Sequence, residues 1–181
     1  MYEVYMEHDL LRPLEFSRKT YEGGMVKTEN YKFDHQNQLI YSTIENNEAG
    51  RVSDTIALKS CTHDILTAIY FSRNYDFGKC KVNQKIPIMV LMDAEFYPMY
   101  IRYLGTERIS DREDVEYDCL KFSVMLAEGS MFNSGENMTV WVTNDGNRIP
   151  ILIEANIIVG SIKAYLSSYK NIRHPFDAKV K

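Results

Sequence analysis

Short runs in which apolar and polar residues alternate dominate the chain and indicate β-strands. These runs are rich in Val, Ile, Tyr, Phe and Thr, and turn residues interrupt them roughly every eight to twelve positions, which is the pattern of an all-β meander. The second and third runs meet at Gly23 and Gly24, which readily take the positive φ angles of a tight hairpin turn. The pattern predicts about ten strands. The eleven candidate runs are Tyr2–His8, Leu14–Tyr21, Met25–Phe33, Gln38–Glu45, Arg51–Leu58, Ile86–Met92, Phe96–Ile109, Cys119–Leu126, Met138–Thr143, Arg148–Ala155 and Ile157–Tyr169.

One segment, Asp64–Arg73, has helical periodicity instead. Ile65, Leu66 and Ile69 recur at the spacing of one helix face, and Thr62 is the expected N-cap. A helix this short needs a sheet to pack against. We therefore expect its apolar face to cover part of the sheet.

Two strands carry apolar residues on both faces, whereas the first five carry them on one. Ile86–Met92 and Val140–Val142 are apolar at successive positions, so we expect them to be covered on both sides. The predicted fold is therefore mainly β: one curved antiparallel sheet, a meander forming an open half-barrel, wrapped around one short α-helix at about residues 64 to 73. We expect residues 1–181 to form a single domain with a frayed tail from about His174 onward.

Composition excludes several classes of protein. The chain has 181 residues, 45% of them hydrophobic, which is enough apolar material for a folded core. Its net charge is -4 and its basic residues form no block, so a phosphate-backbone binder is not expected. No apolar run approaches the ~20 residues of a transmembrane helix.

The three cysteines, Cys61, Cys80 and Cys119, are too few and too widely spaced for a disulfide scaffold or a zinc knuckle. They are either three unpaired thiols or, outside the cytoplasm, one bridge between Cys61 and Cys119 with one thiol left over. The sequence leaves both alternatives open.

Catalytic and metal-binding signatures are absent from the sequence. It contains no nucleophile elbow, phosphate-binding glycine loop or zinc-protease helix, and its four histidines have no metal-ligand spacing. The acidic stretch Asp111–Asp118 lacks the ligand order of a calcium loop. We therefore expect no enzymatic activity, no cofactor and no metal.

The strongest candidate for ligand contact is the aromatic strand that begins at Phe96. Tyr100 and Tyr103, with Met99 beside them, could line a groove for a sugar or a lipid tail, since tyrosine has an apolar ring and a polar hydroxyl. Core packing and cross-strand pairing are the alternative for the same residues.

Four blocks of the chain, in order, carry a family resemblance. They are Cys61–Arg73, Ile101–Arg108, Tyr117–Phe122 and Val140–Pro150. With these blocks the chain resembles the bacterial domain-of-unknown-function 3108 family, from about Leu10 to Phe176. The resemblance implies an exported protein of the periplasm or cell envelope of Gram-negative bacteria, with no established activity, cofactor or catalytic residues.

The start of the chain departs from the family pattern. Family members usually carry an export or lipoprotein signal and further strands before the point where Met1 stands here, and this sequence shows no signal peptide. By that comparison we expect the chain to be the C-terminal portion of a longer exported protein. A sheet edge would then lack its partner, which predicts an edge-to-edge homodimer.

Two hypotheses for function follow. The first is a non-enzymatic binding module of the envelope whose concave, Met- and Tyr-rich face accepts a hydrophobic or amphipathic ligand such as a lipid. The second is a structural or protein-interaction module whose concavity is filled by the helix Asp64–Arg73 and whose outer surface meets another envelope protein.

Overall fold

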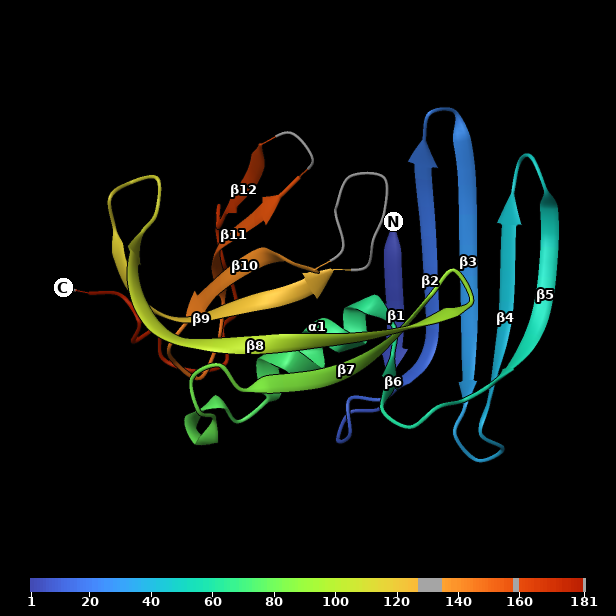
Figure 1. Cartoon of the computed structure of the whole chain (residues 1–181), viewed down its shortest axis with the longest axis horizontal. Coiled ribbons are helices and arrows are strands. Elements are labelled where there is room, and N and C mark those ends of the chain that lie inside the picture. The colour runs from blue at the N-terminus through green and yellow to red at the C-terminus, as the bar shows by residue number, and fades with distance from the viewer. Residues whose placement is uncertain (127–134, 158–159, 181) are drawn as a thin grey trace. The chain divides into compact units, whose positions relative to one another are not determined.

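The computed structural model describes residues 1–126, 135–157 and 160–180. Most of these residues lie in β-strands that form two sheets, of five and seven strands (Figure 1). The expectation of a mainly β protein with one short α-helix is confirmed. The expectation of one continuous sheet is wrong, because the fifth strand has a partner on one side only and the chain then starts a second sheet. The alternation of apolar and polar residues identifies a strand but does not show which other strand it pairs with.

The first sheet is a sequential antiparallel meander. Its strands are β1 (Tyr2–Met6), β2 (Pro13–Glu22), β3 (Met25–Asp34), β4 (Leu39–Asn46) and β5 (Gly50–Ala57). The second sheet has the order β12-β11-β10-β9-β8-β7-β6. Its strands are β6 (Thr62–His63), β7 (Lys85–Met92), β8 (Glu95–Ser110), β9 (Glu116–Leu126), β10 (Gly135–Thr143), β11 (Pro150–Asn156) and β12 (Ser161–Tyr165). The helix α1 (Ile65–Asn74) and the short 3-10 helix η1 (Phe77–Lys79) lie between β6 and β7 in the chain.

The described chain divides into two compact units. The first comprises residues 1–74 and 88–98, and the second comprises residues 75–87 together with those from 99 onward. The strands β7 and β8 therefore contribute residues to both units. The alternation of apolar and polar residues cannot predict this division, because each strand keeps its apolar pattern on both sides of the boundary.

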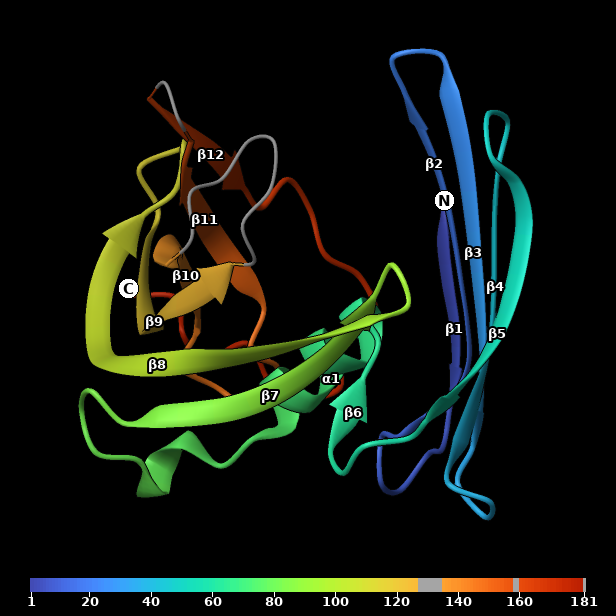
Figure 2. The same cartoon turned by 45° about the vertical axis from the view of Figure 1, so that its right-hand side comes forward.

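The core of the first unit covers the inner face of the five-stranded sheet. Its centre consists of Phe16, Tyr31, Phe33, Ile40 and Leu91, and Leu66 of α1 and Phe96 of β8 pack against it. Figure 2 shows the five strands β1 to β5 almost edge-on, as a single layer. The helix and residues of β7 and β8 thus fill this face of the sheet.

The N-terminus of α1 differs from the expectation. Asp64, and not Thr62, is the cap: its Oδ1 accepts the backbone N–H groups of Leu66 at 2.8 Å and Thr67 at 3.1 Å. The Thr62 hydroxyl donates instead to the carbonyl of Lys59 at 2.8 Å. The carboxylate is the stronger acceptor for helix N–H groups because it also complements the dipole.

The buried face of α1 also differs from the expectation. Thr67 is fully buried and Leu66 packs on the core, whereas Ile65 and Ile69 are exposed. The predicted shared apolar face of Ile65, Leu66 and Ile69 is therefore wrong. Asp64 accepts hydrogen bonds from the backbone and the hydroxyl of Thr67, and this hydrogen-bonded pair is fully buried where the two isoleucines were expected.

The core of the second unit lies among the strands β9, β10 and β11. It consists of Tyr117, Cys119, Trp141, Ile151 and Leu152, with Phe176 and Tyr165 among the residues packed against it. The strand β8 bends strongly along its length (Figure 1). Its register with β9 shifts between Tyr103 and Gly105, where Gly105 has a φ of 101°.

The C-terminal tail is held against the second unit, so the expectation of fraying from His174 is wrong. Ala178 is buried, its carbonyl accepts the N–H of Asp118 at 2.8 Å, and the N–H of Val180 donates to Glu116 at 2.9 Å. Pairing between β9 and β10 ends at Cys119, so the first residues of β9 have a free edge that the tail fills.

Asn147 is the side chain that fastens this tail, and its replacement provides a test. Its amide donates to the carbonyls of His174 at 2.9 Å and Pro175 at 3.0 Å, and its carbonyl accepts the N–H of His174. We expect Asn147→Ala to lower the free energy of unfolding by about 1 to 3 kcal/mol and to speed hydrogen exchange at the amide of Val180. The control Lys170→Ala should change neither, and unchanged exchange in Asn147→Ala would contradict this role.

Candidate binding site

Two rows of side chains cross the outer face of the five-stranded sheet, opposite the core. Successive residues of a strand point to opposite faces, so the partners of each outward residue continue its row across the sheet. The first row consists of Tyr5, Glu15, Lys32, Tyr41 and Thr55, and the second of Glu3, Ser17, Asn30, Thr43 and Ser53. We call the first the tyrosine row and the second the polar row.

A hollow of about 390 Å³ lies over these rows, lined from β1, β2, β3 and β4. Within the hollow, the tyrosine row runs from Tyr5 on β1 to Tyr41 on β4, and these residues are 59% and 44% exposed. Between them, Lys32 and Glu15 form an exposed ion pair with 3.6 Å between Nζ and Oε1. The hollow belongs wholly to the first unit.

The side chains of this face are only lightly engaged with one another. The hydroxyl of Tyr5 donates to Glu3 at 3.0 Å, and this hydrogen bond to a carboxylate raises the pKa of Tyr5. The hydroxyls of Thr43 and Ser53 lie 3.2 Å apart. Both tyrosine rings and most polar atoms of the rows are therefore accessible to a ligand.

The inner face of the same sheet carries a buried charge cluster. Glu29 is 1% exposed, and its carboxylate accepts hydrogen bonds from Arg18 and, at 3.0 Å, from the hydroxyl of Tyr31. Lys27 and Arg18 also bind Asp93, which lies in the turn between β7 and β8. We call these residues, Arg18, Lys27, Glu29 and Asp93, the charge cluster.

The two carboxylates of the charge cluster are shifted in opposite directions. Burial raises the pKa of Glu29, and the neighbouring Asp93 carboxylate adds to this effect against the pull of Arg18. Burial would also raise the pKa of Asp93, but hydrogen bonds from the cluster outweigh it and lower the value to about 2. Each carboxylate of the charge cluster is thus paired with both cations, Arg18 and Lys27.

The second unit contains a comparable arrangement around Glu136. Its carboxylate accepts Arg102 Nε at 2.9 Å, the hydroxyl of Tyr100 at 2.6 Å and the hydroxyl of Ser123. The hydrogen bonds from Arg102, followed by those from Ser123 and Tyr100, lower the pKa of Glu136 to about 2 against the effect of burial. The ammonium of Lys85 lies 4.0 Å from the centre of the Tyr100 ring.

The structure separates the three residues that the sequence singled out for ligand contact. Tyr103 is buried against Phe77 and Phe122, with ring centres 6.1 and 5.6 Å away, which favours the core alternative for it. Tyr100 is engaged with Glu136, and Met99 is half-buried. None of the three lines the hollow over the tyrosine row.

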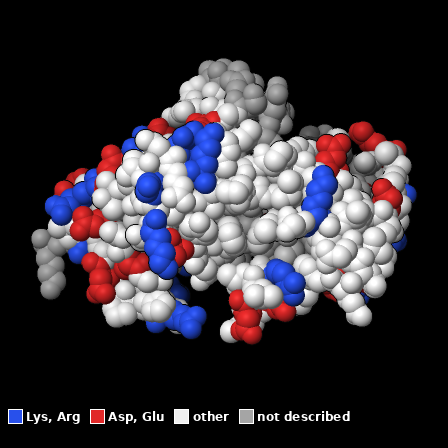
Figure 3. Space-filling view, turned by 60° about the horizontal axis from the view of Figure 1, so that its bottom comes forward, with Lys and Arg blue, Asp and Glu red and all other residues white. Residues whose placement is uncertain are grey.

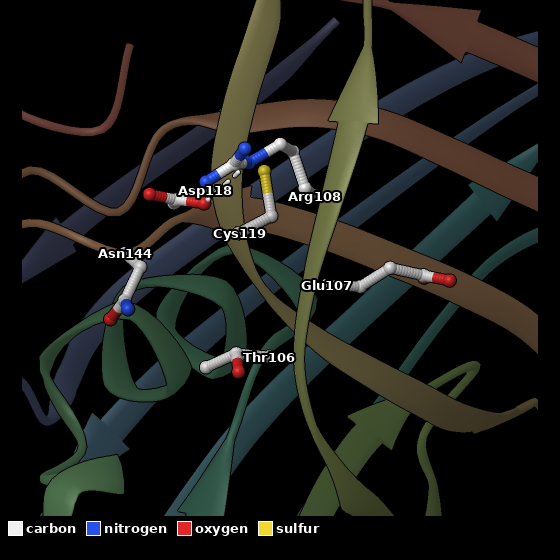
Figure 4. Close-up of a pocket in the computed structure, with 6 residues that line it drawn as sticks. All are labelled: Thr106, Glu107, Arg108, Asp118, Cys119 and Asn144. Carbon is white, nitrogen blue, oxygen red and sulfur yellow. Dashed lines mark hydrogen bonds and ion pairs between the residues drawn. The ribbon is translucent and has the colours of Figure 1, made fainter. Parts of the chain in front are cut away.

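A second hollow, of about 370 Å³, lies in the second unit (Figure 4). It is lined by Thr106, Glu107, Arg108, Asp118, Cys119 and Asn144. Arg108 and Asp118 are paired at 3.1 Å, while the Glu107 side chain points away from the other five (Figure 4). Burial raises the pKa of Cys119 to about 12, so its thiol is a poor nucleophile.

The remaining candidates for chemistry are dispersed. Cys61, Cys80 and Cys119 are all unpaired, so the alternative of a Cys61–Cys119 bridge is not the one found. Within residues 1–126, 135–157 and 160–180, His, Cys, Asp and Glu form no group of three that could hold a metal ion. In the same part of the chain, no helix has the length and apolar character needed to cross a bilayer.

On the face shown in Figure 3, basic and acidic side chains are interspersed and no wide basic patch forms. This agrees with the net charge of -4. A protein that binds a phosphate backbone concentrates Lys and Arg on one surface instead.

The comparisons with known proteins give one match. The family model described as "Protein of unknown function (DUF3108)" matches residues 1–167. No curated protein matches the chain, and no solved structure does.

The depressed pKa of Glu136 makes a prediction about pH. A carboxyl that is more acidic in the folded than in the unfolded state stabilises the fold above its unfolded pKa, and this contribution is lost as the pH falls toward about 2. We therefore expect Glu136→Gln to destabilise the protein at about pH 6 and much less at about pH 2.5 in urea titrations. Glu154→Gln, whose carboxylate lies 3.4 Å from Lys163 and is similarly half-buried, is the control; an equal loss for Glu136→Gln at both pH values would contradict the prediction.

The placement of Tyr103 predicts a structural rather than a binding phenotype. Removing a buried aromatic side chain costs about 3 to 5 kcal/mol through lost burial and the cavity left behind. We expect Tyr103→Ala to lower the free energy of unfolding by this amount, and Tyr97→Ala, on the same strand, by far less. A near-neutral Tyr103→Ala would contradict its place in the core.

Proposed function

Because the chain belongs to DUF3108, a family of proteins of unknown function, we propose a function from its geometry: a non-enzymatic binding module of the bacterial cell envelope. Its binding surface is the hollow on the outer face of the five-stranded sheet, and its ligand is amphipathic. The observation that carries this proposal is the pair of exposed rings, Tyr5 and Tyr41, standing in one row of a polar, open hollow.

Exposed tyrosines in a polar hollow suit an amphipathic ligand. A tyrosine ring offers an apolar face to the C–H groups of a ligand, and its hydroxyl and polar neighbours offer hydrogen bonds. The hollow, at about 390 Å³, is within the size range of small-molecule sites. On the inner face of the same sheet, Leu66 and Phe96 pack against the core cluster that contains Leu91.

The absence of catalytic function is also a proposal, supported by the state of the titratable groups. A catalytic acid or base needs a pKa near the working pH and access to substrate. Glu29, Asp93 and Glu136 are instead committed to ion pairs, and the Cys119 thiol is buried. Within the described residues, these perturbed groups act in folding.

The location in the envelope is supported by the family resemblance of the four sequence blocks. Exported proteins that meet lipids and glycans need binding surfaces that work without a cofactor, and the hollow meets that need with side chains alone.

A second candidate function, a protein-interaction module, is favoured by the strand β5. It is the last strand of its sheet, eight residues long, and nearly every residue of it is exposed. An unpaired strand edge presents backbone donors and acceptors to another strand. The predicted edge-to-edge homodimer would use such an edge.

The proposed function is tested with a ligand that carries both an alkyl tail and a sugar headgroup. We expect n-dodecyl maltoside, below its critical micelle concentration, to bind the purified full chain in isothermal titration calorimetry. The double variant Tyr5→Ala/Tyr41→Ala should weaken binding by about tenfold or more, since each ring contributes on the order of 1 kcal/mol.

A matched control is available in two other exposed tyrosines. Tyr21 and Tyr70 are exposed but do not line the hollow, so Tyr21→Ala/Tyr70→Ala should bind as the wild type does. Equal binding by both double variants, or no binding by a folded protein, would overturn the proposed site. A molecular mass that rises with concentration, without ligand binding, would favour the β5 interaction module.

A further inference from the structure

Resting on the proposed function, we infer that the ligand of the tyrosine row is an uncharged oligosaccharide chain that crosses the strands of the sheet and contacts both tyrosine rings. The inference depends on how the rings are spaced, on what lies between them and on the chemistry of the neighbouring row.

The spacing of the rings sets the length of the ligand. Tyr5 lies on β1 and Tyr41 on β4, with Glu15 and Lys32 as the intervening members of the row. Three strand spacings separate the two tyrosines, which is about 14 Å. A single sugar ring cannot span this distance, so a ligand that meets both tyrosines must be a chain.

The ion pair between the two tyrosine rings disfavours the binding of a hydrocarbon chain. An acyl chain crossing from Tyr5 to Tyr41 would lie on the carboxylate of Glu15 and the ammonium of Lys32 and would desolvate both. A sugar chain has hydroxyl groups that both donate and accept hydrogen bonds, so it can replace the water around these charges. The side chains of the pair are exposed, 55% for Glu15 and 70% for Lys32, and breaking such an ion pair costs little free energy.

The polar row supplies groups that match sugar hydroxyls. Ser17, Asn30 and Thr43 line the hollow and carry hydroxyl or amide groups, each of which donates and accepts. They lie beside the tyrosine row, so one ligand can stack its C–H face on a ring and direct its hydroxyls to the polar row. Flat aromatic surfaces with neighbouring uncharged hydrogen-bonding groups are what a saccharide requires.

The charge of the hollow favours an uncharged sugar over an anionic one. Its lining contains two carboxylates, Glu3 and Glu15, against one ammonium, Lys32, which Glu15 already partners. Two negative charges against one positive charge leave the hollow with a formal charge of -1. A phosphorylated or carboxylated ligand would meet net repulsion there.

Neutral oligosaccharides of defined length test the inference. We expect maltohexaose or N-acetylchitohexaose to shift the backbone amide resonances of residues on β1 to β4 in heteronuclear NMR titrations, and glucose or N-acetylglucosamine to bind at least tenfold more weakly because they engage one ring only. Tyr5→Ala/Tyr41→Ala should abolish the advantage of the hexasaccharide over the monosaccharide. Tyr5→Phe/Tyr41→Phe, which keeps the rings, should retain it.

A sugar-free amphipath separates failure of the inference from failure of the proposed function. If dodecyl maltoside and a dodecyl sulfobetaine bind equally well through the two tyrosines and no hexasaccharide binds, the site stands and the saccharide assignment is overturned. If neither amphipath nor hexasaccharide binds a folded wild type, both proposals fail. Both proposals are supported if the hexasaccharide binds to the variant Tyr21→Ala/Tyr70→Ala but not to the variant Tyr5→Ala/Tyr41→Ala.

Discussion

The buried carboxylate of Glu29 is the constraint on which the first unit depends. A charge that is 1% exposed is stable only if it is paired and hydrogen-bonded. Arg18 stands directly opposite it on β2, and Lys27 lies on the same face two residues away on β3. These two cations in turn require a second carboxylate, and Asp93 provides it from the turn between β7 and β8. Charge balance thus fastens a turn from a distant part of the sequence to the five-stranded sheet.

That fastening determines which face of the sheet is open. The Tyr31 hydroxyl donates to Glu29 and accepts the N–H of Ala94 at 2.9 Å, so the turn is held by backbone as well as by charge. With the turn in place, Leu91 and Phe96 complete the core on the inner face. The tyrosine rings and polar groups of the outer face stay exposed, so this face of the sheet is open to a ligand.

The sequence anticipated most of the strands but singled out none of the residues that line the candidate site. Gly23 and Gly24 make a two-residue turn, and such a turn sets the register of the hairpin, so the pairing of Glu15 with Lys32 was open to prediction. The row reaches Tyr5 and Tyr41 through longer turns. The sequences of these longer turns do not specify the register of the strands that they connect. The strand that begins at Phe96 is rich in tyrosine, but tyrosine content does not distinguish the buried Tyr103 from the exposed Tyr5 and Tyr41.

By itself, the sequence indicated most of the strands, the mainly β class and the family, because alternation, turn residues and ordered sequence blocks are local signals. Only the tertiary structure decided that the strands form two sheets, that Asp64 caps the helix, and that the tail is held by Asn147. It also decided that Glu29 is buried among cations while Tyr5 and Tyr41 share one open row. These features depend on which distant residues become neighbours, and the free energy of pairing a charge or filling a strand edge exists only once those neighbours are in place.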